Sequence, residues 1–346
     1  MEIFTQKDFE QHEQIMYCYD KKSGLKAIIA IHNTTLGPGL GGCRFWNYED
    51  EKEALIDVLR LSKGMSYKAA LANLELGGGK AVIIGDARSD KSPELLASFA
   101  RYVDRLCGSY ITAEDVGTTV ADMELVSKHT PHVVGLDKNG GSGDPSIFTA
   151  LGVFQGLKAC NKYLTGSDDL KGKHVTIQGL GKVGEDLAKR LRNVGASLTI
   201  TDIDYTHAKQ LAKELGASVV EPDDIYSVKA DYFSPCALGA VLSDDTIPRL
   251  RVKAVCGSAN NQLVRSYHAE TLSERGILYA PDFLVNAGGL VNVYYEYNKT
   301  YDEAVATSKV EEIYDTLLQI LEISERHNTL PLNAAKQLAE ERIKVN

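Results

Sequence analysis

The sequence lacks the features that mark metal-binding, disulfide-rich and membrane proteins. Its six cysteines are scattered without a C-x-x-C pair, which excludes a zinc knuckle and a disulfide framework. Its eight histidines form no H-x-x-x-H pair and none lies in a glycine motif, so we assign neither a metal site nor a catalytic histidine. No apolar run reaches the roughly 20 residues that span a bilayer, and residues 1–14 do not resemble a signal peptide. We therefore expect a cytoplasmic protein with no membrane partner.

The sequence also lacks an excess of basic residues. Its formal net charge of -9 argues against general affinity for nucleic acid or anionic lipid. There is no internal repeat and no low-complexity tract. The length of 346 residues is more than one core usually needs and suits two domains.

The segment 172–195, GKHVTIQGLGKVGEDLAKRLRNVG, carries the strongest positive signal. Its pattern predicts a strand, a glycine turn and a helix. Gly179, Gly181 and Gly184 have the G-x-G-x-x-G spacing, in which they permit a tight turn, a close approach of backbone to a pyrophosphate, and close helix–strand packing. The amino terminus of the following helix offers unpaired N–H groups and a positive dipole end to phosphates.

A strand at 198–201 follows and ends in Asp202, about 20 residues beyond the glycines, where an acid accepts hydrogen bonds from an adenosine ribose. A G-x-G-x-x-G match alone is weak, because glycine turns are common. The complete unit of strand, turn, helix, strand and acid predicts a dinucleotide site, with NAD favoured over NADP.

Strand and helix patterns alternate along the chain, which predicts an α/β fold. The expected strands are 16–19, 25–32, 81–84, 110–113, 174–178, 198–201, 217–220, 232–234, 254–256 and 277–279. The expected helices are 51–63, 93–106, 148–163, 302–326 and 332–342, besides the one that follows the glycine turn. The polar, glycine-rich segment Asp137–Asp144 is expected to act as a hinge.

Several other glycine-rich or acidic segments have two interpretations each. Leu76–Lys80 is either a tight surface turn with an exposed lysine or a backbone that must approach a ligand closely. The acids in 111–119 either face the crevice of an α/β sheet or cap the next helix. Segment 34–44 is either a Pro-Gly turn or a loop that presents Arg44 to an anion. Loops 257–263 and 280–293 are either cofactor-crevice loops or ordinary turns.

Eight motifs in order along nearly the whole chain resemble the Glu/Leu/Phe/Val amino-acid dehydrogenase family, and most closely its leucine dehydrogenases. They are LGPGLGGCR, KGMSYKAALANLELGGGKAVI, YITAEDVGTT, GDPSIFTALGV, QGLGKVG, PCALGA, GSANNQL and YAPDFLVNAGGLVNV. The resemblance implies NAD-dependent, reversible oxidative deamination of an L-amino acid to a 2-oxo acid, with release of ammonia.

The resemblance also implies roles for individual residues. Lys80 and Asp115 are similar to the catalytic lysine and aspartate, and Lys68 to the lysine that holds the substrate carboxylate. Further substrate contacts are implied for Leu40, Gly41, Gly42, Met65, Ala113, Asn261, Leu290 and Val293. Cofactor contacts are implied for Arg44, Ser146, Thr149, Gly179, Leu180, Gly181, Lys182, Val183, Gly184, Asp202, Ile203, Ala237, Leu238, Ala259, Asn260 and Asn261.

These assignments agree with the chemistry of deamination. A substrate carboxylate needs a fixed cation, which Lys68 supplies as a point charge. Attack of water on an iminium needs a base, and Lys80 serves while its amine is uncharged. Asp115 can take a proton from the substrate ammonium and return it to the departing amine.

The sequence indicates the class of amino-acid substrate more clearly than the individual amino acid. Leu40, Ala113, Leu290 and Val293 form an apolar set without a charge for a glutamate side chain, which favours leucine, isoleucine and valine. Tyr294 and Tyr295 depart from the leucine pattern, so phenylalanine or tryptophan remains an alternative. A hydroxy-acid dehydrogenase lacks support because no histidine lies in a site motif. A non-catalytic sensor of NAD or amino acid is disfavoured because Lys68, Lys80 and Asp115 are intact.

The predicted architecture is two α/β domains separated by a cleft. Residues 1–136, with 328–346 returning to them, form the expected substrate and oligomerisation domain. Residues 145–327 form the expected doubly wound, Rossmann-type NAD domain. The resemblance implies a homo-oligomer, an octamer or a dimer.

Overall fold

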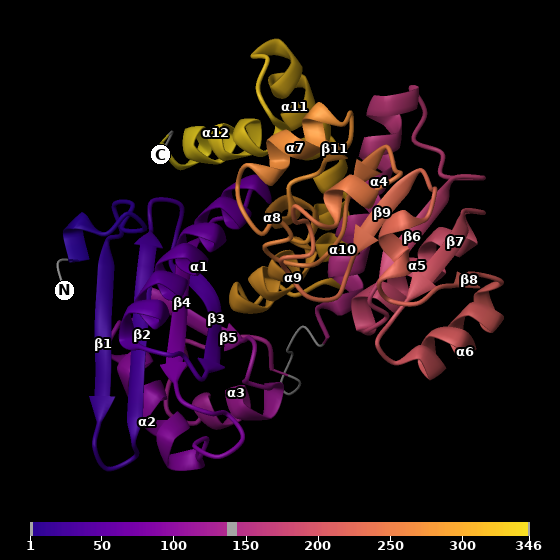
Figure 1. Ribbon diagram of the computed structural model, residues 1–346. Coiled ribbons are helices and arrows are strands. Elements are labelled where there is room, and N and C mark those ends of the chain that lie inside the picture. The colour runs from indigo at the N-terminus through magenta and orange to yellow at the C-terminus, as the bar shows by residue number, and fades with distance from the viewer. Residues whose placement is uncertain (1–2, 137–143, 345–346) are drawn as a thin grey trace. The chain divides into compact units, whose positions relative to one another are not determined.

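The computed structural model describes residues 3–136 and 144–344, which form two compact units (Figure 1). The first unit takes its residues from Met1–Asp144, Val293–Asp302 and Ala339–Asn346, and the second from Pro145–Asn292 and Glu303–Leu338. Residues 137–143 of the expected hinge lie outside the described ranges.

The division differs from the expected one at the carboxyl end. Residues 328–338 belong to the second unit, and the return to the first begins at Ala339. The physical reason lies in helix α12 (Pro331–Lys344), whose Leu332 packs into the core of the second unit, whereas its Glu340 accepts a hydrogen bond from Tyr67. Val293–Asp302, the other segment of the first unit, was expected in the second domain.

The first unit is built on a five-stranded sheet with the order β1-β2-β4-β3-β5. The strands are β1 (Gln14–Asp20), β2 (Leu25–Asn33), β3 (Gly39–Trp46), β4 (Gly77–Ile84) and β5 (Tyr110–Glu114). β1 and β2 form an antiparallel pair, as do β2 and β4, while β3 runs parallel to both β4 and β5. Gln14–Asp20 is an edge strand.

Helices cover both faces of this sheet. α1 (Glu51–Leu71) packs on one face, and α2 (Pro93–Asp104) with α3 (Val120–Val126) covers the other. The short η1 (Ile3–Thr5) precedes β1. Each helix begins at a side-chain cap: Asp50 for α1, Ser92 followed by Pro93 for α2, and a Thr119–Asp122 capping box for α3.

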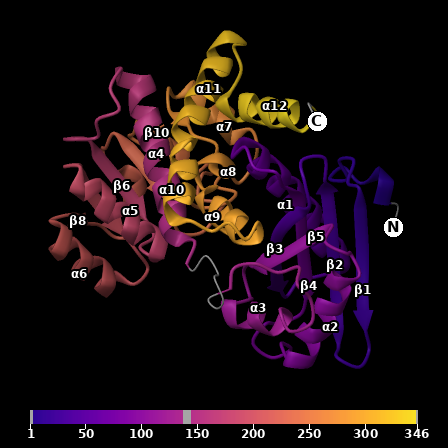
Figure 2. The same cartoon turned by 180° about the vertical axis from the view of Figure 1, so that it is seen from behind.

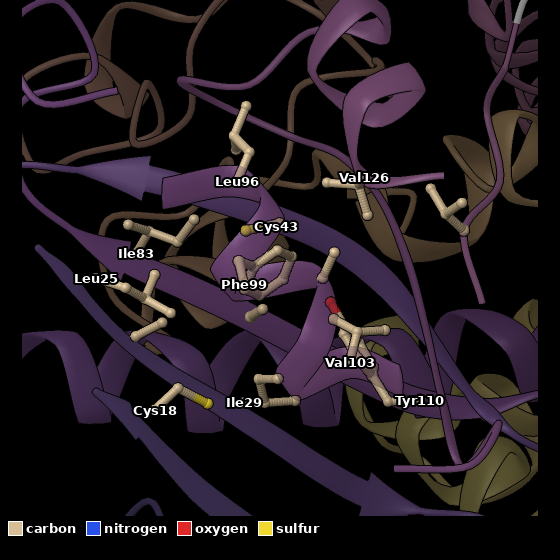
Figure 3. Packing of buried hydrophobic residues seen from close by; sticks show 14 of the residues in the cluster. Cys18, Leu25, Ile29, Cys43, Ile83, Leu96, Phe99, Val103, Tyr110 and Val126 are labelled. Atoms are coloured by element: carbon tan, nitrogen blue, oxygen red, sulfur yellow. The ribbon is translucent and has the colours of Figure 1, made fainter. Parts of the chain in front are cut away.

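The two-residue period of the strands sorts their side chains between the two faces. On β2, Leu25, Ile29 and Ile31 pack against α2, as do Cys43 of β3 and Ile83 of β4, around the fully buried Phe99 (Figure 3). The intervening residues, among them Val82, pack against α1. Lys80 and Val82 therefore lie on the α1 face of β4.

The second unit contains a six-stranded sheet in which every paired strand is parallel, with the order β11-β10-β9-β6-β7-β8. The strands are β6 (His174–Gln178), β7 (Ser197–Thr201), β8 (Ser218–Val219), β9 (Tyr232–Pro235), β10 (Ala254–Val255) and β11 (Leu278–Tyr279). Numbered from β6, this is the 3-2-1-4-5-6 order of doubly wound dinucleotide-binding sheets.

The helices of this unit lie before, between and after its strands. They are α4 (Ser146–Thr165), α5 (Lys182–Asn193), α6 (Tyr205–Leu215), α7 (His268–Glu274), α8 (Asp282–Val285), α10 (Glu303–Glu311) and α11 (Ile313–Arg326), with the turns η2 (Asp224–Ser227) and η3 (Ile247–Arg249). α11 and α10 pack beside α4 (Figure 2). α9 (Gly288–Tyr297) has residues in both units. No helix within the described ranges is long and apolar enough to cross a bilayer.

Several elements differ from the sequence-based expectation. Segment 34–44 contains strand β3 rather than only a turn, and α1 continues to Leu71 instead of ending near residue 63. The single helix expected over 302–326 is divided into α10 and α11, and the loop expected at 280–293 contains α8 and the start of α9. Glycines and asparagines, which resemble turn signals, lie inside regular structure here because tertiary packing outweighs local propensity.

Candidate active site

Lys80 and Asp115 form an ion pair in the first unit. Lys80 lies in β4 and Asp115 directly follows β5, with β3 between these strands. Lys80 Nζ lies 2.7 Å from Asp115 Oδ2, and the two side chains are 8% and 20% exposed. Water screens such a pair less than a surface pair, so its electrostatic interaction is stronger.

A glycine in β3 allows these two side chains to meet. The parallel register of β3 brings Gly42 beside Ala113 on β5, and the next residue, Cys43, beside Ala81 on β4, which follows Lys80. A Cβ at position 42 would lie 2.3 Å from Glu114 O and 2.8 Å from Asp115 Cβ. Real Cβ atoms do not approach this closely, so only glycine lets the end of β5 lie against β3 and present Asp115 to Lys80.

Arg44 supplies a second cation to Asp115. Its Nε lies 3.3 Å from Asp115 Oδ2, and its Nη1 donates to Asp57 Oδ2 at 2.9 Å. Burial by itself opposes ionisation of Asp115, but the Lys80 and Arg44 charges outweigh it and lower the pKa of Asp115 to about 2. Asp115 is therefore a carboxylate throughout the neutral pH range.

The backbone around Asp115 is also fixed. The Asp115 N–H donates to Thr118 Oγ1 at 2.9 Å, and the Thr118 hydroxyl donates to Cys43 O at 2.9 Å. Lys91 Nζ donates to Gly117 O at 3.1 Å from the other side of the same loop. Hydrogen bonds thus connect the loop after β5 to strand β3 and to Lys91, the residue before the N-cap of α2.

Other residues predicted to contact substrate lie around the Lys80 face of the sheet. Leu40 and Ala113 share that face because of the strand period. Met65 and Lys68, both half-buried, are three residues apart on α1 and so project to the same side of the helix. Val293 is also in the first unit.

The end of α1 that carries Lys68 is held by the carboxyl-terminal segment. The Tyr67 hydroxyl donates to Glu340 Oε1 at 2.7 Å. Arg342 Nη1 donates to the carbonyls of Ala70 and Leu71 at 3.0 and 2.9 Å, which satisfies acceptors at the end of the helix.

The glycine turn of the second unit connects β6 to α5. Gly179 has a φ of +94°, and its N–H donates to Thr201 O at 2.9 Å. A Cβ on Gly184 would lie 1.9 Å from Gly179 O, so the helix packs directly on the turn. Gly181 is the N-cap of α5 without a side-chain cap, and a Cβ there would meet no atom within 4 Å.

Asp202 lies beside this turn at the end of β7. Its Oδ2 accepts a hydrogen bond from Leu180 N–H at 2.6 Å, and its Oδ1 accepts from Asp204 N–H at 2.8 Å. Ile203 is 94% exposed. A helix N-terminus that begins at Gly181, a glycine turn and a strand-end carboxylate together fit a dinucleotide.

Two further loops reach the same edge of the sheet. Loop 236–240 follows β9 and loop 257–263 follows β10. Ala240 N–H donates to Asn261 O at 2.8 Å, which ties the loops together, and the Asn260 side chain accepts from Asn286 Nδ2 at 2.7 Å. Their predicted cofactor residues are Ala237, Leu238, Ala259, Asn260 and Asn261, of which Leu238 is 82% exposed.

The remaining predicted cofactor residues occupy helix starts. Ser146 and Thr149 are in the first turn of α4, where Thr149 Oγ1 donates to Pro145 O at 3.1 Å. Lys182 and Val183 open α5. Asn261 and Leu290 belong to the second unit, as does every predicted cofactor residue except Arg44, which lies in the first unit against Asp115.

Sequence reasoning missed Asp57 and His207. Asp57, in the second turn of α1, binds Arg44 and accepts from the Tyr48 hydroxyl at 2.6 Å. His207 Nε2 lies 3.2 Å from Leu180 O and 3.4 Å from Glu185 Oε2. Nothing local distinguishes either residue, because both act through contacts that the fold creates. Within the described ranges no cluster of His, Cys, Asp and Glu could hold a metal ion.

The fold and these residues define a class, a two-domain α/β dehydrogenase with a doubly wound dinucleotide-binding unit. Models of the "Glu/Leu/Phe/Val dehydrogenase, dimerisation domain" and of "Glutamate/Leucine/Phenylalanine/Valine dehydrogenase" match residues 12–132 and 201–345. The chain belongs to this family of amino-acid dehydrogenases. The predicted family, fold class and enzyme class are thereby confirmed, and members of the family are NAD(P)-dependent.

Individual relatives cover nearly the whole chain. It is 50% identical over 347 residues to a leucine dehydrogenase of Bacillus cereus, covering 99% of this chain and 94% of the relative. It is 55% identical over 315 residues to a phenylalanine dehydrogenase of Lysinibacillus sphaericus, covering 89% and 82%. The crystal structure of L-tryptophan dehydrogenase from Nostoc punctiforme superimposes with a TM-score of 0.87 at 46% identity, covering 96% of each chain. A hetero-hexameric glutamate dehydrogenase from Thermus thermophilus shares the fold, with a TM-score of 0.78 at 21% identity, covering 96% of this chain and 88% of that chain.

Proposed function

We propose that the chain catalyses the reversible, NAD-dependent oxidative deamination of L-leucine, with isoleucine and valine as further substrates. The observation that carries this proposal is the shielded Lys80–Asp115 pair, 2.7 Å apart, in a chain that also has a dinucleotide turn. A lysine and a carboxylate in contact provide a base and a proton carrier for amine chemistry. We assign the acid–base pair and the binding of the substrate carboxylate to the first unit, and the dinucleotide turn that binds NAD to the second.

In this mechanism Lys68 holds the substrate carboxylate as a fixed positive charge. Lys80 and Arg44 both contact Asp115 Oδ2, so a substrate ammonium can donate to Oδ1. Because the pKa of Asp115 is held at about 2 in the free enzyme, Asp115 enters the reaction ionised. It becomes an effective proton acceptor only as Lys80 loses its positive charge.

NAD, when bound, accepts the hydride that leaves the substrate Cα. The resulting iminium carbon is attacked by water, from which the uncharged Lys80 amine removes a proton. Asp115, which took a proton from the substrate ammonium, then returns it to the amine of the water adduct. As the C–N bond breaks and ammonia leaves, the hydroxyl of the adduct loses its remaining proton to water, which gives the 2-oxo acid. The proton transfers that precede and follow the hydride step use Lys80 or Asp115 as donor or acceptor, which explains why both members must be present.

Leucine is favoured over glutamate because the predicted side-chain contacts, Leu40, Ala113, Leu290 and Val293, carry no charge. The 50% identity to a leucine dehydrogenase over nearly the whole chain supports this choice. A phenylalanine or tryptophan dehydrogenase is the second candidate. It is favoured by Tyr294 and Tyr295, half-buried rings 5.3 Å apart in α9, and by the phenylalanine and tryptophan dehydrogenases among the relatives.

NAD is proposed over NADP because of Asp202. A 2′-phosphate on the adenosine ribose would lie near this carboxylate, and like charges repel at that distance. We also propose a cytoplasmic homo-oligomer, a dimer or an octamer, since the model that matches residues 12–132 is named for dimerisation. Light scattering after size exclusion measures that state.

The decisive experiment follows NADH absorbance with a panel of L-Leu, L-Ile, L-Val, L-Phe, L-Trp and L-Glu at fixed NAD. We expect the highest kcat/KM with leucine, and we expect turnover of its 2-oxo acid only when ammonium is present. Oxidation of NADH by the oxo acid without ammonium would show a hydroxy-acid dehydrogenase. Lys80→Ala should bind NADH as the unaltered enzyme does while turnover is lost.

A further inference from the structure

Asp57 is the outermost member of a chain of alternating charges that ends at Lys80. Its Oδ2 accepts from Arg44 Nη1 at 2.9 Å and from the Tyr48 hydroxyl at 2.6 Å. The other side of the same guanidinium contacts Asp115, which in turn contacts Lys80. The four charged side chains come from α1, β3, the end of β5 and β4, so only the folded sheet brings them together.

This network is shielded and rigidly supported. The Arg44 and Asp57 side chains are 22% and 26% exposed. Tyr48 is 8% exposed and packs against Leu55 and Val58 in the core between α1 and the sheet. Burial and the hydrogen bond to Asp57 raise the pKa of the Tyr48 hydroxyl, so it remains a donor to Asp57 over the whole working pH range.

We propose that Asp57 is a positioning residue for the deamination proposed above: it holds Arg44 against Asp115 and balances the charge around the Lys80–Asp115 pair. An unanchored arginine side chain has many rotamers, and few of them direct Nε to Asp115. Asp57 selects one of these by binding the far end of the guanidinium. The inference rests on the proposed function for its link to catalysis.

The charge balance has a measurable consequence. Lys80 and Arg44 carry two positive charges, and Asp115 and Asp57 carry two negative charges. Removing the Asp57 charge leaves an excess positive charge close to Lys80, which favours the uncharged amine. The pH at which Lys80 becomes reactive should therefore fall, by roughly 0.5–1 unit at distances and screening typical of partly buried groups.

Several other titratable groups surround this network of four charged side chains. On the α1 side these are Tyr48 after β3 and Lys68 on α1. Cys43 of β3 and Tyr110 and Glu114 of β5 lie on the other face of the sheet, and the Lys91–Asp122 pair lies beside the loop after Asp115. Burial raises the pKa values of the Cys43 thiol and the Tyr110 hydroxyl, so both stay neutral at neutral pH. In Asp57→Asn the Tyr48 hydroxyl loses its charged acceptor, and Tyr48→Phe measures the effect of that hydrogen bond separately.

The test compares Asp57→Asn, Asp57→Glu and Tyr48→Phe with the matched control Asp8→Asn. Asp8 Oδ1 lies 2.7 Å from Arg60 Nε, so it forms a comparable ion pair with the same helix α1. Two readouts are used: the pH profile of kcat/KM for L-leucine, and the rate of Lys80 modification by trinitrobenzenesulfonate against pH, followed by peptide mass spectrometry. NADH binding and circular dichroism check that each variant is folded.

We expect Asp57→Asn to lower both pH midpoints by roughly 0.5–1 unit and kcat by about tenfold, with NADH affinity unchanged. Asp57→Glu should restore the midpoints, and Asp8→Asn should leave both readouts as they are. A folded Asp57→Asn with unchanged midpoints overturns the proposal. If Asp57→Asn does not fold, Tyr48→Phe decides: a several-fold loss of kcat supports the role of Asp57, and an unchanged kcat overturns it.

Failure of the proposed function gives a different pattern. An enzyme that deaminates no amino acid on the panel, yet shows the lower labelling midpoint in Asp57→Asn, refutes the substrate proposal and supports the charge balance. An active enzyme whose labelling midpoint does not move refutes Asp57 alone.

Discussion

Lys80 Nζ and Asp115 Oδ2 lie 2.7 Å apart although β3 separates their strands. The contact depends on the absence of a side chain at one position of β3. Gly42 of β3 has no side chain that would separate Lys80 on β4 from Asp115 after β5. The end of β5 occupies the space that a Cβ of residue 42 would fill. The glycine cluster that resembles a flexible turn in the sequence therefore sets the geometry of the acid–base pair.

Gly42→Ala should separate the pair. Its Cβ would be 2.3 Å from Glu114 O, a backbone atom that cannot rotate away, so the end of β5 must move. We expect kcat/KM for L-leucine to fall at least about 100-fold, because displacements near 1 Å at a reacting group have effects of this size. NADH affinity, measured by fluorescence titration, should change less than about twofold.

Gly64→Ala is the matched control for that substitution. Gly64 lies in α1 and a Cβ there would meet no atom within 4 Å. Alanine is favoured over glycine in a helix by about 1 kcal/mol, so this variant should be at least as stable and as active as the unaltered enzyme. Equal activity losses in the two variants would contradict the role of Gly42.

Asp115→Asn should destabilise the protein in a pH-dependent manner. The folded-state pKa of Asp115 is about 2, below the ordinary value of 3.8, so its ionisation stabilises the fold by about 2 kcal/mol. This contribution is fully present above about pH 4 and is lost as the pH falls through about 2. Substitution also leaves Lys80 and Arg44 without their shared carboxylate.

The measurement is urea unfolding of both proteins from pH 7 to pH 3. The difference in unfolding free energy should stay constant between pH 7 and pH 5 and shrink below pH 4. A difference that grows on acidification would mean that the folded-state pKa of Asp115 lies above its ordinary value, and would contradict the role of the Lys80 and Arg44 charges.

The sequence predicts parts of the site that depend on local pattern. The turn at Gly179–Gly184 and the acid at Asp202 could be placed because strand, turn, helix and acid follow within about 30 residues. The start of the helix expected at residue 93 is also correct, because Ser92 caps it through a local hydrogen bond. Conversely, β3 was missed because its glycines carry no strand signal, and only pairing with β4 and β5 makes the segment extended.

The sequence could not predict the partners that the fold brings together. Arg44 is predicted as a cofactor contact, and nothing in the sequence indicates that it also contacts Asp115, 71 residues away. In the sequence, Asp57 resembles any polar residue of an amphipathic helix. Its role becomes visible only in the folded protein, where β3 places Arg44 beside it. Long-range ion pairs have no periodic signature, so motif spacing cannot reveal them.

His207→Ala should weaken dinucleotide binding. Two side chains contact the Leu180 backbone. Its N–H donates to Asp202 Oδ2 at 2.6 Å, and its carbonyl oxygen lies 3.2 Å from His207 Nε2. Losing one support frees the glycine turn, so we expect the Kd for NADH to rise about 3- to 10-fold with kcat unchanged at saturating cofactor. Isothermal titration measures Kd directly.

Two further variants show whether the effect of His207→Ala belongs to the turn. His207→Gln keeps an N–H donor and should recover most of the affinity. His174→Ala removes another half-buried histidine of the same unit, whose Nε2 lies 2.9 Å from Thr199 Oγ1 in the neighbouring strand. It should leave Kd unchanged, and a comparable loss there would indicate general destabilisation instead.

Asp202→Asn should shift the preference between the two nicotinamide dinucleotides. The amide oxygen can still accept from Leu180 N–H, so the turn keeps its shape, while the charge that repels a 2′-phosphate is gone. We expect the ratio of Kd for NADPH to Kd for NADH to fall at least about tenfold, since a removed charge repulsion of this kind is worth about 1.4 kcal/mol or more. Asp204→Asn, two residues further on, removes an equal charge from the cap of α6 and should leave the ratio nearly unchanged. Equal shifts in both variants would mean that net charge alone, and not the position of Asp202 beside the turn, selects the dinucleotide.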